Sequence, residues 1–431
     1  MKNLRFIKPT LLLFVFIFFG FTGNSENNLK NSNTISYQET NVIISGKIVD
    51  AKTNQPIAFV SVTATGTNIG TVSNTDGEFT LKFEKSLNVK SLTFKYIGYQ
   101  NKVVEISSVP EKKFKIKLNP FVISIEEVVI RPNDPKELIQ EILNRIPQNY
   151  SEKANKEMAF YREYIKNKRK YVSISEAVVE IYKAPYNKEY SYDLVKLYKG
   201  HKSAKVKAQD TIIMKLKGGP KTALLLDIAK NPYILFSDEK LEDYDFTLKD
   251  ITNIDNQQNY ILIFQQKPNP EQALFNGKIY VNIKTLAITA AEFSLNLENI
   301  SEASKVFIRK KPLFLKIRPT NTKYLVNYTE NNGKYYFSHA RGEVEFEVKW
   351  KRKLFKSHYS VMTEIAITDR SDKNVQKIPK NQQLKAGIVF DEKVYPFSDT
   401  DFWGKYNTIK PEESIQRTIK KYGFKLKIQD N

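Results

Sequence analysis

The chain has 431 residues, enough for two or three separate cores, and its mean hydropathy of -0.45 is that of an ordinary globular protein. It contains no cysteine, which excludes disulfide bonds, thiolate nucleophiles and cysteine metal ligands. A formal net charge of +21 favours an anionic surface as partner, although lysines on solvent faces and sheet edges would give the same excess.

The N-terminal residues predict a Sec signal peptide over residues 1–25. Basic residues precede an apolar run at 11–21, and Gly23-Asn24-Ser25 offers small side chains for cleavage before Glu26. A retained anchor is the alternative, but the run is short for a hydrocarbon layer of about 30 Å. No later stretch could form a transmembrane segment after signal cleavage. We therefore expect a periplasmic or outer-membrane-associated protein that meets no nucleic acid.

Residues 26–41 predict a polar linker, and residues 42–119 predict a β-sandwich. Apolar and polar residues alternate in short runs, which Gly, Pro and Asp interrupt at intervals of roughly ten residues. Thr75-Asp76-Gly77 predicts a turn, because Gly readily adopts positive φ. The predicted strands include residues 44–50, 58–65, 79–83, 91–96, 103–106 and 113–118.

The same residues resemble a known family. Ile44–Asp50, Pro56–Val60, Thr75–Phe79 and Tyr96–Tyr99 are similar, in order and spacing, to the carboxypeptidase regulatory-like domain. This is a transthyretin-like sandwich with which Bacteroidetes begin many envelope proteins. The resemblance covers residues 42–119 and implies a non-catalytic interaction module without peptidase activity.

Residues 120–156 predict a connecting segment with a helix. Ile125–Ile130 resembles the segment that follows the same module in TonB-dependent outer-membrane receptors, although nothing plug-like comes after it. Instead, Asp134 can cap a helix whose first turn accommodates Pro135, and an apolar stripe continues to Ile146.

Residues 157–370 predict a larger antiparallel β-rich domain. Two strands at 158–165 and 171–182 would pair around a basic turn, and Asn331-Asn332-Gly333 has the sequence of a hairpin turn. The positive charge is densest at residues 166–170 and 349–356. Further strands are predicted at 260–265, 277–283, 288–297, 324–329, 334–337, 341–349 and 357–368.

Part of this domain resembles the LolA-like half-barrel. The resemblance rests on Gly277–Asn282 leading into Leu286–Ile288 as one hairpin. It implies a concave apolar face that could hold a lipid chain or a partner's apolar segment. The alternative is that the same apolar side chains fill an ordinary hydrophobic core.

Residues 371–431 predict a C-terminal extension with a short helix. Phe402 and Trp403 are expected to pack the extension against the sheet, with glycan stacking as the alternative. Lys410–Glu413 predicts the start of a helix, and Gly423 its end.

No pattern predicts a catalytic, cofactor-binding or metal-binding residue. His201, His339 and His358 each lack a Glu three residues later, and no zinc-protease, nucleophile-elbow or phosphate-loop motif occurs. Three pairs of acidic residues that are close in sequence leave open the alternative of a hydrolase of envelope glycan or peptide. Residues close in sequence, however, need not face each other in space. They are Glu126-Glu127, Asp399 with Asp401, and Glu412-Glu413.

The sequence thus predicts a mainly β fold. A seven-stranded transthyretin-like or Ig-like β-sandwich precedes a larger antiparallel β-meander of α+β type. The predicted function is that of a non-catalytic envelope binding protein without cofactors, whose partner could be a protein, a glycan or a lipid. A periplasmic lipid or lipoprotein carrier, an accessory component of TonB-dependent uptake and an undetected hydrolase remain as alternatives.

Overall fold

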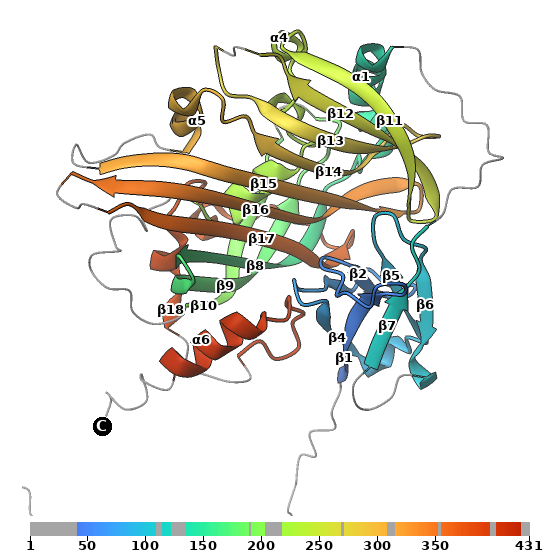
Figure 1. The fold of residues 1–431 in the computed structure, drawn as a ribbon. Helices are drawn as coiled ribbons and strands as arrows, with labels where there is room; N and C mark the ends of the chain where they lie inside the picture. The colour runs from blue at the N-terminus through green and yellow to red at the C-terminus, as the bar shows by residue number, and fades with distance from the viewer. Residues whose placement is uncertain are drawn as a thin grey trace, which may run out of the picture. The chain divides into compact units, whose positions relative to one another are not determined.

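A computed structural model shows a mainly β protein (Figure 1). The predicted signal peptide, all but the last residue of the predicted linker, and Ile125–Ile130 lie outside the described residues. The described residues are 41–108, 114–121, 134–188, 191–202, 218–268, 271–307, 315–351, 355–396 and 402–423.

The N-terminal part is the predicted sandwich, and its seven described strands form the sheets β4-β1-β7 and β3-β2-β5-β6. Phe79 and Leu81 point from β4 into the core, where the Phe79 ring meets that of Phe94 at 5.5 Å. The strands are β1 (Asn41–Asp50), β2 (Ser61–Ala64), β3 (Gly70–Val72), β4 (Glu78–Glu84), β5 (Ser91–Lys95), β6 (Lys102–Glu105) and β7 (Phe114–Leu118), with 3-10 turns η1 (Lys85–Leu87) and η2 (Ile106–Ser108).

Two turns of the sandwich decide the path of the chain. The predicted turn at Gly77 is confirmed: its φ is +74°, and an added Cβ would lie 2.4 Å from the carbonyl oxygen of Ile48. The strand predicted at 58–65 is wrong at its start, because β2 begins only at Ser61. Phe59 has a φ of 61°, which bulky residues rarely adopt, so the chain bends there before the strand begins.

Helices α1 (Pro135–Asn144) and α2 (Ile146–Asn149) follow the sandwich. The Asp134 side chain accepts a hydrogen bond from the Lys136 amide at 2.7 Å, so the predicted cap is confirmed. Leu138, Ile139 and Ile142 form the buried stripe of α1.

The larger part is one eleven-stranded sheet in the order β11-β12-β13-β14-β15-β16-β17-β8-β9-β10-β18. Its strands pair antiparallel, except that β10 and the two-residue β18 are parallel. The strands are β8 (Asn155–Asn167), β9 (Lys170–Lys183), β10 (Leu194–Lys202), β11 (Tyr244–Ile254), β12 (Gln257–Gln266), β13 (Phe275–Asn282), β14 (Ile288–Leu295), β15 (Leu315–Asn331), β16 (Lys334–Trp350), β17 (Ser357–Ser371) and β18 (Tyr395–Pro396), with α5 (Ile300–Phe307) between β14 and β15.

The predicted meander is confirmed, with two corrections. The separate strands predicted at 334–337 and 341–349 are the single strand β16, because an irregularity near Ser338 interrupts the alternation without ending the pairing with β15. The predicted strands also omit β10 and β11. The hairpin turn is confirmed by the positive φ of Asn332 and Gly333.

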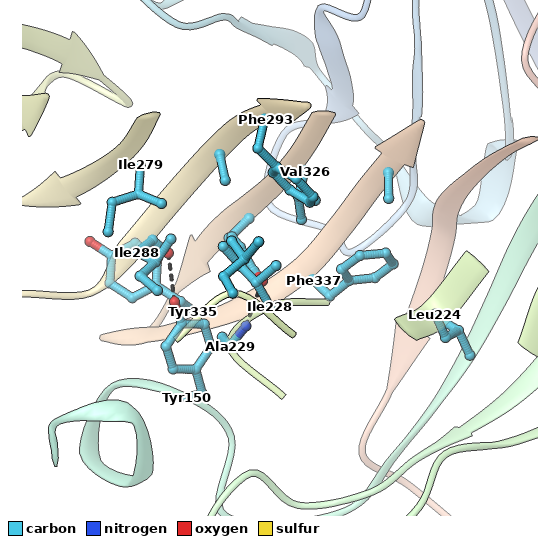
Figure 2. Close-up of a cluster of buried hydrophobic side chains, with 14 of the residues drawn as sticks. Tyr150, Leu224, Ile228, Ala229, Ile279, Ile288, Phe293, Val326, Tyr335 and Phe337 are labelled. Atoms are coloured by element: carbon cyan, nitrogen blue, oxygen red, sulfur yellow. Dashed lines mark hydrogen bonds between the residues drawn. The ribbon is translucent and has the colours of Figure 1, made fainter. Parts of the chain in front are cut away.

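One face of the large sheet is apolar and is covered by the chain itself. Ile279 and Ile288 of the predicted LolA-like hairpin lie in one buried cluster with Leu224 and Ile228 (Figure 2). Their side chains therefore fill a core. The covering elements are α1, α2, α3 (Pro220–Ala223), η3 (Leu224–Leu226), η4 (Pro232–Ile234) and α4 (Asp238–Leu241).

The opposite face carries a row of buried charges, here called the charge ladder. Its members are cross-strand partners on β16, β17, β8, β9 and β10, in the order Arg341, Glu364, Arg162, Glu176 and His201. Arg162 Nε donates to Glu176 Oε1 at 2.6 Å, and His201 Nε2 lies 2.8 Å from Glu176 Oε2. Each carboxylate thus lies between basic side chains, which offsets the cost of removing it from water.

The C-terminal extension packs over this ladder. Phe402 stacks on His201 at 4.6 Å, and Trp403 meets Phe160 edge-on at 5.6 Å, so the predicted packing of both residues is confirmed. Arg162 Nη2 also donates to the carbonyl oxygen of Ile409 at 2.8 Å. The extension contains η5 (Lys380–Gln382), η6 (Phe390–Lys393) and α6 (Glu413–Gly423), which ends at the predicted Gly. Among the described residues, no helix has the length and apolar character needed to cross a membrane.

Candidate binding cleft

A cleft of about 630 Å³ lies between the sandwich and the large sheet. Its sandwich wall consists of β2, β3 and the loop Thr65–Asn68, and its sheet wall includes β15, β16 and the turn Glu330–Asn332. Clefts between two structural parts that both supply lining residues are frequent ligand sites.

Asn68 joins the two walls. Its Oδ1 accepts hydrogen bonds from Asn331 Nδ2 at 2.9 Å and from Arg370 Nη2 at 3.0 Å, while its Nδ2 donates to the Arg370 carbonyl at 3.0 Å. The Arg370 guanidinium also lies over the Tyr336 ring, 3.5 Å from its centroid. The guanidinium is therefore held in place before any ligand arrives.

A second set of contacts links the sandwich to the turn between β11 and β12. Lys95 Nζ lies 2.6 Å from Asp255 Oδ1, and Asn101 Nδ2 donates to the same oxygen at 2.7 Å. The Gly98 amide donates to the carbonyl of Asn253 at 2.9 Å. Both walls are thus fixed relative to each other at more than one place.

His339 and Asn327 form the deepest polar group of the sheet wall. Burial would raise the pKa of Glu364, but Arg341 and His339 outweigh it and hold that pKa at about 2. The carboxylate accepts from His339 Nε2 at 3.1 Å, which leaves Nδ1 to accept from Asn327 Nδ2 at 3.4 Å. The Oδ1 of Asn327 has no hydrogen-bond partner among the described residues, but protein atoms enclose it, so it does not open onto the cleft.

Phe59 closes the cleft beside this group. Its ring stacks on the imidazole of His339 at 5.6 Å, and the Arg341 guanidinium lies 5.1 Å from the ring centroid. The strained backbone of Phe59 therefore places an aromatic surface at the cleft wall.

The rest of the lining mixes polar and apolar side chains, and its charges balance. Two cations, Lys95 and Arg370, face two carboxylates, Asp255 and Glu330, and hydroxyl groups come from both walls. Ser338 Oγ donates a hydrogen bond to the Asn327 carbonyl oxygen of the same wall at 2.9 Å. A hydroxyl oxygen that donates in this way can still accept a hydrogen bond from a ligand. Hydroxyl groups of the lining include those of Ser61, Thr63, Thr65, Thr289, Thr329 and Ser338.

The three histidines lie in different settings. His201 and His339 are buried against Glu176 and Glu364, whereas His358 is exposed on β17. No group of three or more His, Asp or Glu side chains that could hold a metal ion occurs within the described ranges. Of the acidic neighbours, Glu413 pairs with Arg417 on α6, while Glu126-Glu127, Asp399 and Asp401 lie outside those ranges.

A second polar group is enclosed in the apolar core. Lys183 Nζ lies 2.6 Å from both Asp193 Oδ2 and Asp227 Oδ2, and Tyr186 donates to Asp227 at 2.6 Å. Neither carboxylate oxygen of the neighbouring Glu157 has a hydrogen-bond partner among the described residues, and burial raises the pKa of Glu157 to about 8. This side chain is therefore neutral near pH 7.

Known proteins resemble this chain in two regions. Residues 44–130 match the family model of the CarboxypepD_reg-like domain. The match confirms the predicted resemblance. No curated protein matches the sequence.

Solved structures that resemble the chain include two bacterial proteins. A DUF1329 family protein from Desulfovibrio piger has 14% identity and a TM-score of 0.28 over 57% of this chain and 96% of its own. A LolA superfamily protein from Nitrosomonas europaea has 12% identity and a TM-score of 0.18 over 55% and 97%. Both TM-scores are too low to indicate what the chain binds.

The cleft residues were not among the predicted sites. The turn Asn331-Asn332-Gly333 was predicted as a hairpin turn, and part of it forms the wall opposite the loop Thr65–Asn68. Asn68 and Asn331, which join them, are separated by 263 residues, so no local pattern could pair them.

Proposed function

We propose that this protein is a non-catalytic binding protein of the cell envelope, exported by the Sec pathway, and that its ligand occupies the cleft. The observation that carries the proposal is the cleft itself, with about 630 Å³ of open volume between two walls that hydrogen bonds and an ion pair hold together. Ligand sites commonly have about 300–1,000 Å³.

The polar part of the lining favours an uncharged ligand segment with hydrogen-bonding groups, and apolar side chains such as Phe59 and Ile97 lie beside it. Both cations of the cleft have partners, since Lys95 pairs with Asp255 and Arg370 bonds to Asn68. The polar groups left to a ligand are hydroxyl oxygens of the lining. A hydroxyl-rich or amide-rich segment of an envelope component could pair with them.

The surroundings of His339 support a binding role over a catalytic one. A general base needs a ring nitrogen directed at the substrate, but Nε2 is bonded to Glu364 and Nδ1 lies 3.4 Å from the Asn327 amide. Glu364 itself lies against Arg341.

Photo-crosslinking in the intact envelope tests the proposal. We would place a photoreactive amino acid at Thr65 or at Asn332, which are exposed on opposite walls, and as control at Asp250, which is exposed on β11 outside the cleft. We expect the same adduct from both cleft positions and none from position 250. Adding Thr65→Trp should abolish the adduct at position 332 by filling the cleft, whereas Asp250→Trp should not.

Adducts that are equal at position 250 and in the cleft, or that persist with Thr65→Trp, would contradict the proposal.

Native mass spectrometry of the mature chain from its own envelope addresses the carrier alternative. Because Ile279 and Ile288 are fully buried, we expect no retained acyl chain. A bound lipid mass would instead favour a carrier.

A further inference from the structure

Two basic runs that are far apart in the sequence meet at one end of the large sheet. The turn Lys168-Arg169-Lys170 joins β8 to β9, and the Lys168 amide donates to the carbonyl of His358 at the start of β17, at 2.9 Å. The same end of β17 pairs with the end of β16, through Val348 and Ser357. Since β17 lies between β8 and β16, both runs belong to the same end of the sheet (Figure 1).

Six exposed cations define what is here called the basic end. No described carboxylate forms an ion pair with any of them, whereas the adjacent Lys356 does pair with Glu347 at 2.8 Å. Lys316 and Lys349 are direct cross-strand partners, so their charges reinforce each other. The six are Lys168, Arg169, Lys170, Lys316, Lys349 and Lys351.

Apolar side chains lie among these charges. Phe355, between β16 and β17, is 84% exposed, and Val306 of α5 is 52% exposed. Trp350 is half-buried at the end of β16, opposite Leu315. Exposed aromatic rings beside lysine and arginine are typical of surfaces that bind at a membrane interface.

We propose that the basic end docks on the anionic surface of a lipid bilayer. Near such a surface, each Lys or Arg contributes about 1 kcal/mol, which is about a fivefold gain in partitioning. A phenyl ring as exposed as that of Phe355 gains from entering a bilayer, whereas a soluble acidic polymer offers it nothing comparable. The cations lie on turns and strand ends, so several of them can face a flat surface together.

Vesicle binding by the full mature chain tests this proposal. The probes are vesicles of phosphatidylcholine alone and vesicles with about one third phosphatidylglycerol. We expect sedimentation with the anionic vesicles only, and loss of binding between about 0.1 M and 0.5 M salt. The chain has two tryptophans, so Trp403→Phe leaves Trp350 as the sole tryptophan, and its selectively excited emission should shift to the blue and be quenched by brominated lipid.

Charge reversal supplies a matched comparison. Arg169→Glu, Lys170→Glu, Lys349→Glu and Lys351→Glu together should weaken anionic-vesicle binding at least about tenfold. The control reverses four exposed lysines elsewhere, Lys52, Lys153, Lys249 and Lys377, and so changes the net charge equally. It should bind nearly as well as the native chain, and so should Thr65→Trp, because the cleft takes no part.

Three results would overturn the proposal. They are equal binding to neutral vesicles, equal loss in the reversal and control variants, and binding to a soluble acidic polysaccharide without binding to vesicles. Thermal melts of both variants show whether a loss of binding reflects unfolding.

Discussion

Arg162→Met should destabilise the protein strongly, because it removes the central cation of the charge ladder. Arg162 is 1% exposed, lies between Glu176 and Glu364 in the row, and donates to the Ile409 carbonyl at 2.8 Å. Removing one partner of a buried ion pair costs about 3–5 kcal/mol. In this variant, Glu176 still has His201 as a basic partner, and Glu364 still has Arg341. We therefore expect a loss of unfolding free energy at the lower end of this range, about 3 kcal/mol.

Urea unfolding measures this loss. With Trp350→Phe as background, the remaining Trp403 packs on Phe160 next to the ladder and reports its opening. Arg145→Met is the matched control, because Arg145 pairs with Glu141 at 2.6 Å on an exposed helix face. Exposed pairs of this kind contribute about 0.3–0.5 kcal/mol.

The double variant Arg162→Met with Glu176→Gln isolates the pair. We expect it to be more stable than the sum of the two single losses predicts, by at least about 1.5 kcal/mol, because the single change leaves a buried carboxylate short of a cation. The reasoning fails if Arg162→Met changes the free energy of unfolding no more than Arg145→Met does.

Three further changes test the buried acids and one turn. Burial raises the folded pKa of Glu157 to about 8 from 4.5, so stability should fall by a few kcal/mol as pH rises between these values, and Glu157→Gln should abolish this fall in thermal melts. Although burial opposes it, Arg162 and His201 hold the folded pKa of Glu176 at about 2; stability should therefore fall as pH drops from 4.5 to 2, and less so in Glu176→Gln. An identical pH profile in a variant and the native chain would contradict either assignment. Gly77→Ala should cost about 2 kcal/mol or more in urea unfolding, whereas Gly66→Ala, also at positive φ but in open space, should cost about 1 kcal/mol.

Local patterns located most strands but not all of them. Alternation is the main strand signal, and the two longest missed strands lose it at a bulge, between Leu197 and Lys199 in β10 and between Leu248 and Ile251 in β11. The short strands β3 and β18 were also missed. The helix α1 was predictable because its cap and apolar stripe are contiguous in sequence.

The charge ladder and the cleft were not predictable for a different reason. Arg162 and Glu364 are partners only because β17 returns to pair with β8, a register that no single segment of sequence contains. The basic end depends on the same pairing, since it brings Lys168 next to His358. Both dense basic runs are evident in the sequence, and the topology makes them one surface.

The two faces of the large sheet set different limits on where a ligand can bind. On the apolar face, a lipid chain could enter only by displacing side chains of the buried cluster, among them Ile228, Ile279 and Ile288 (Figure 2). Exposing each such side chain costs about 1.5–3 kcal/mol, so a carrier would have to recover several of these losses from its cargo. On the charged face, the C-terminal extension already covers His201 and Arg162. The cleft needs no such opening, because its volume is present without displacing any part of the chain.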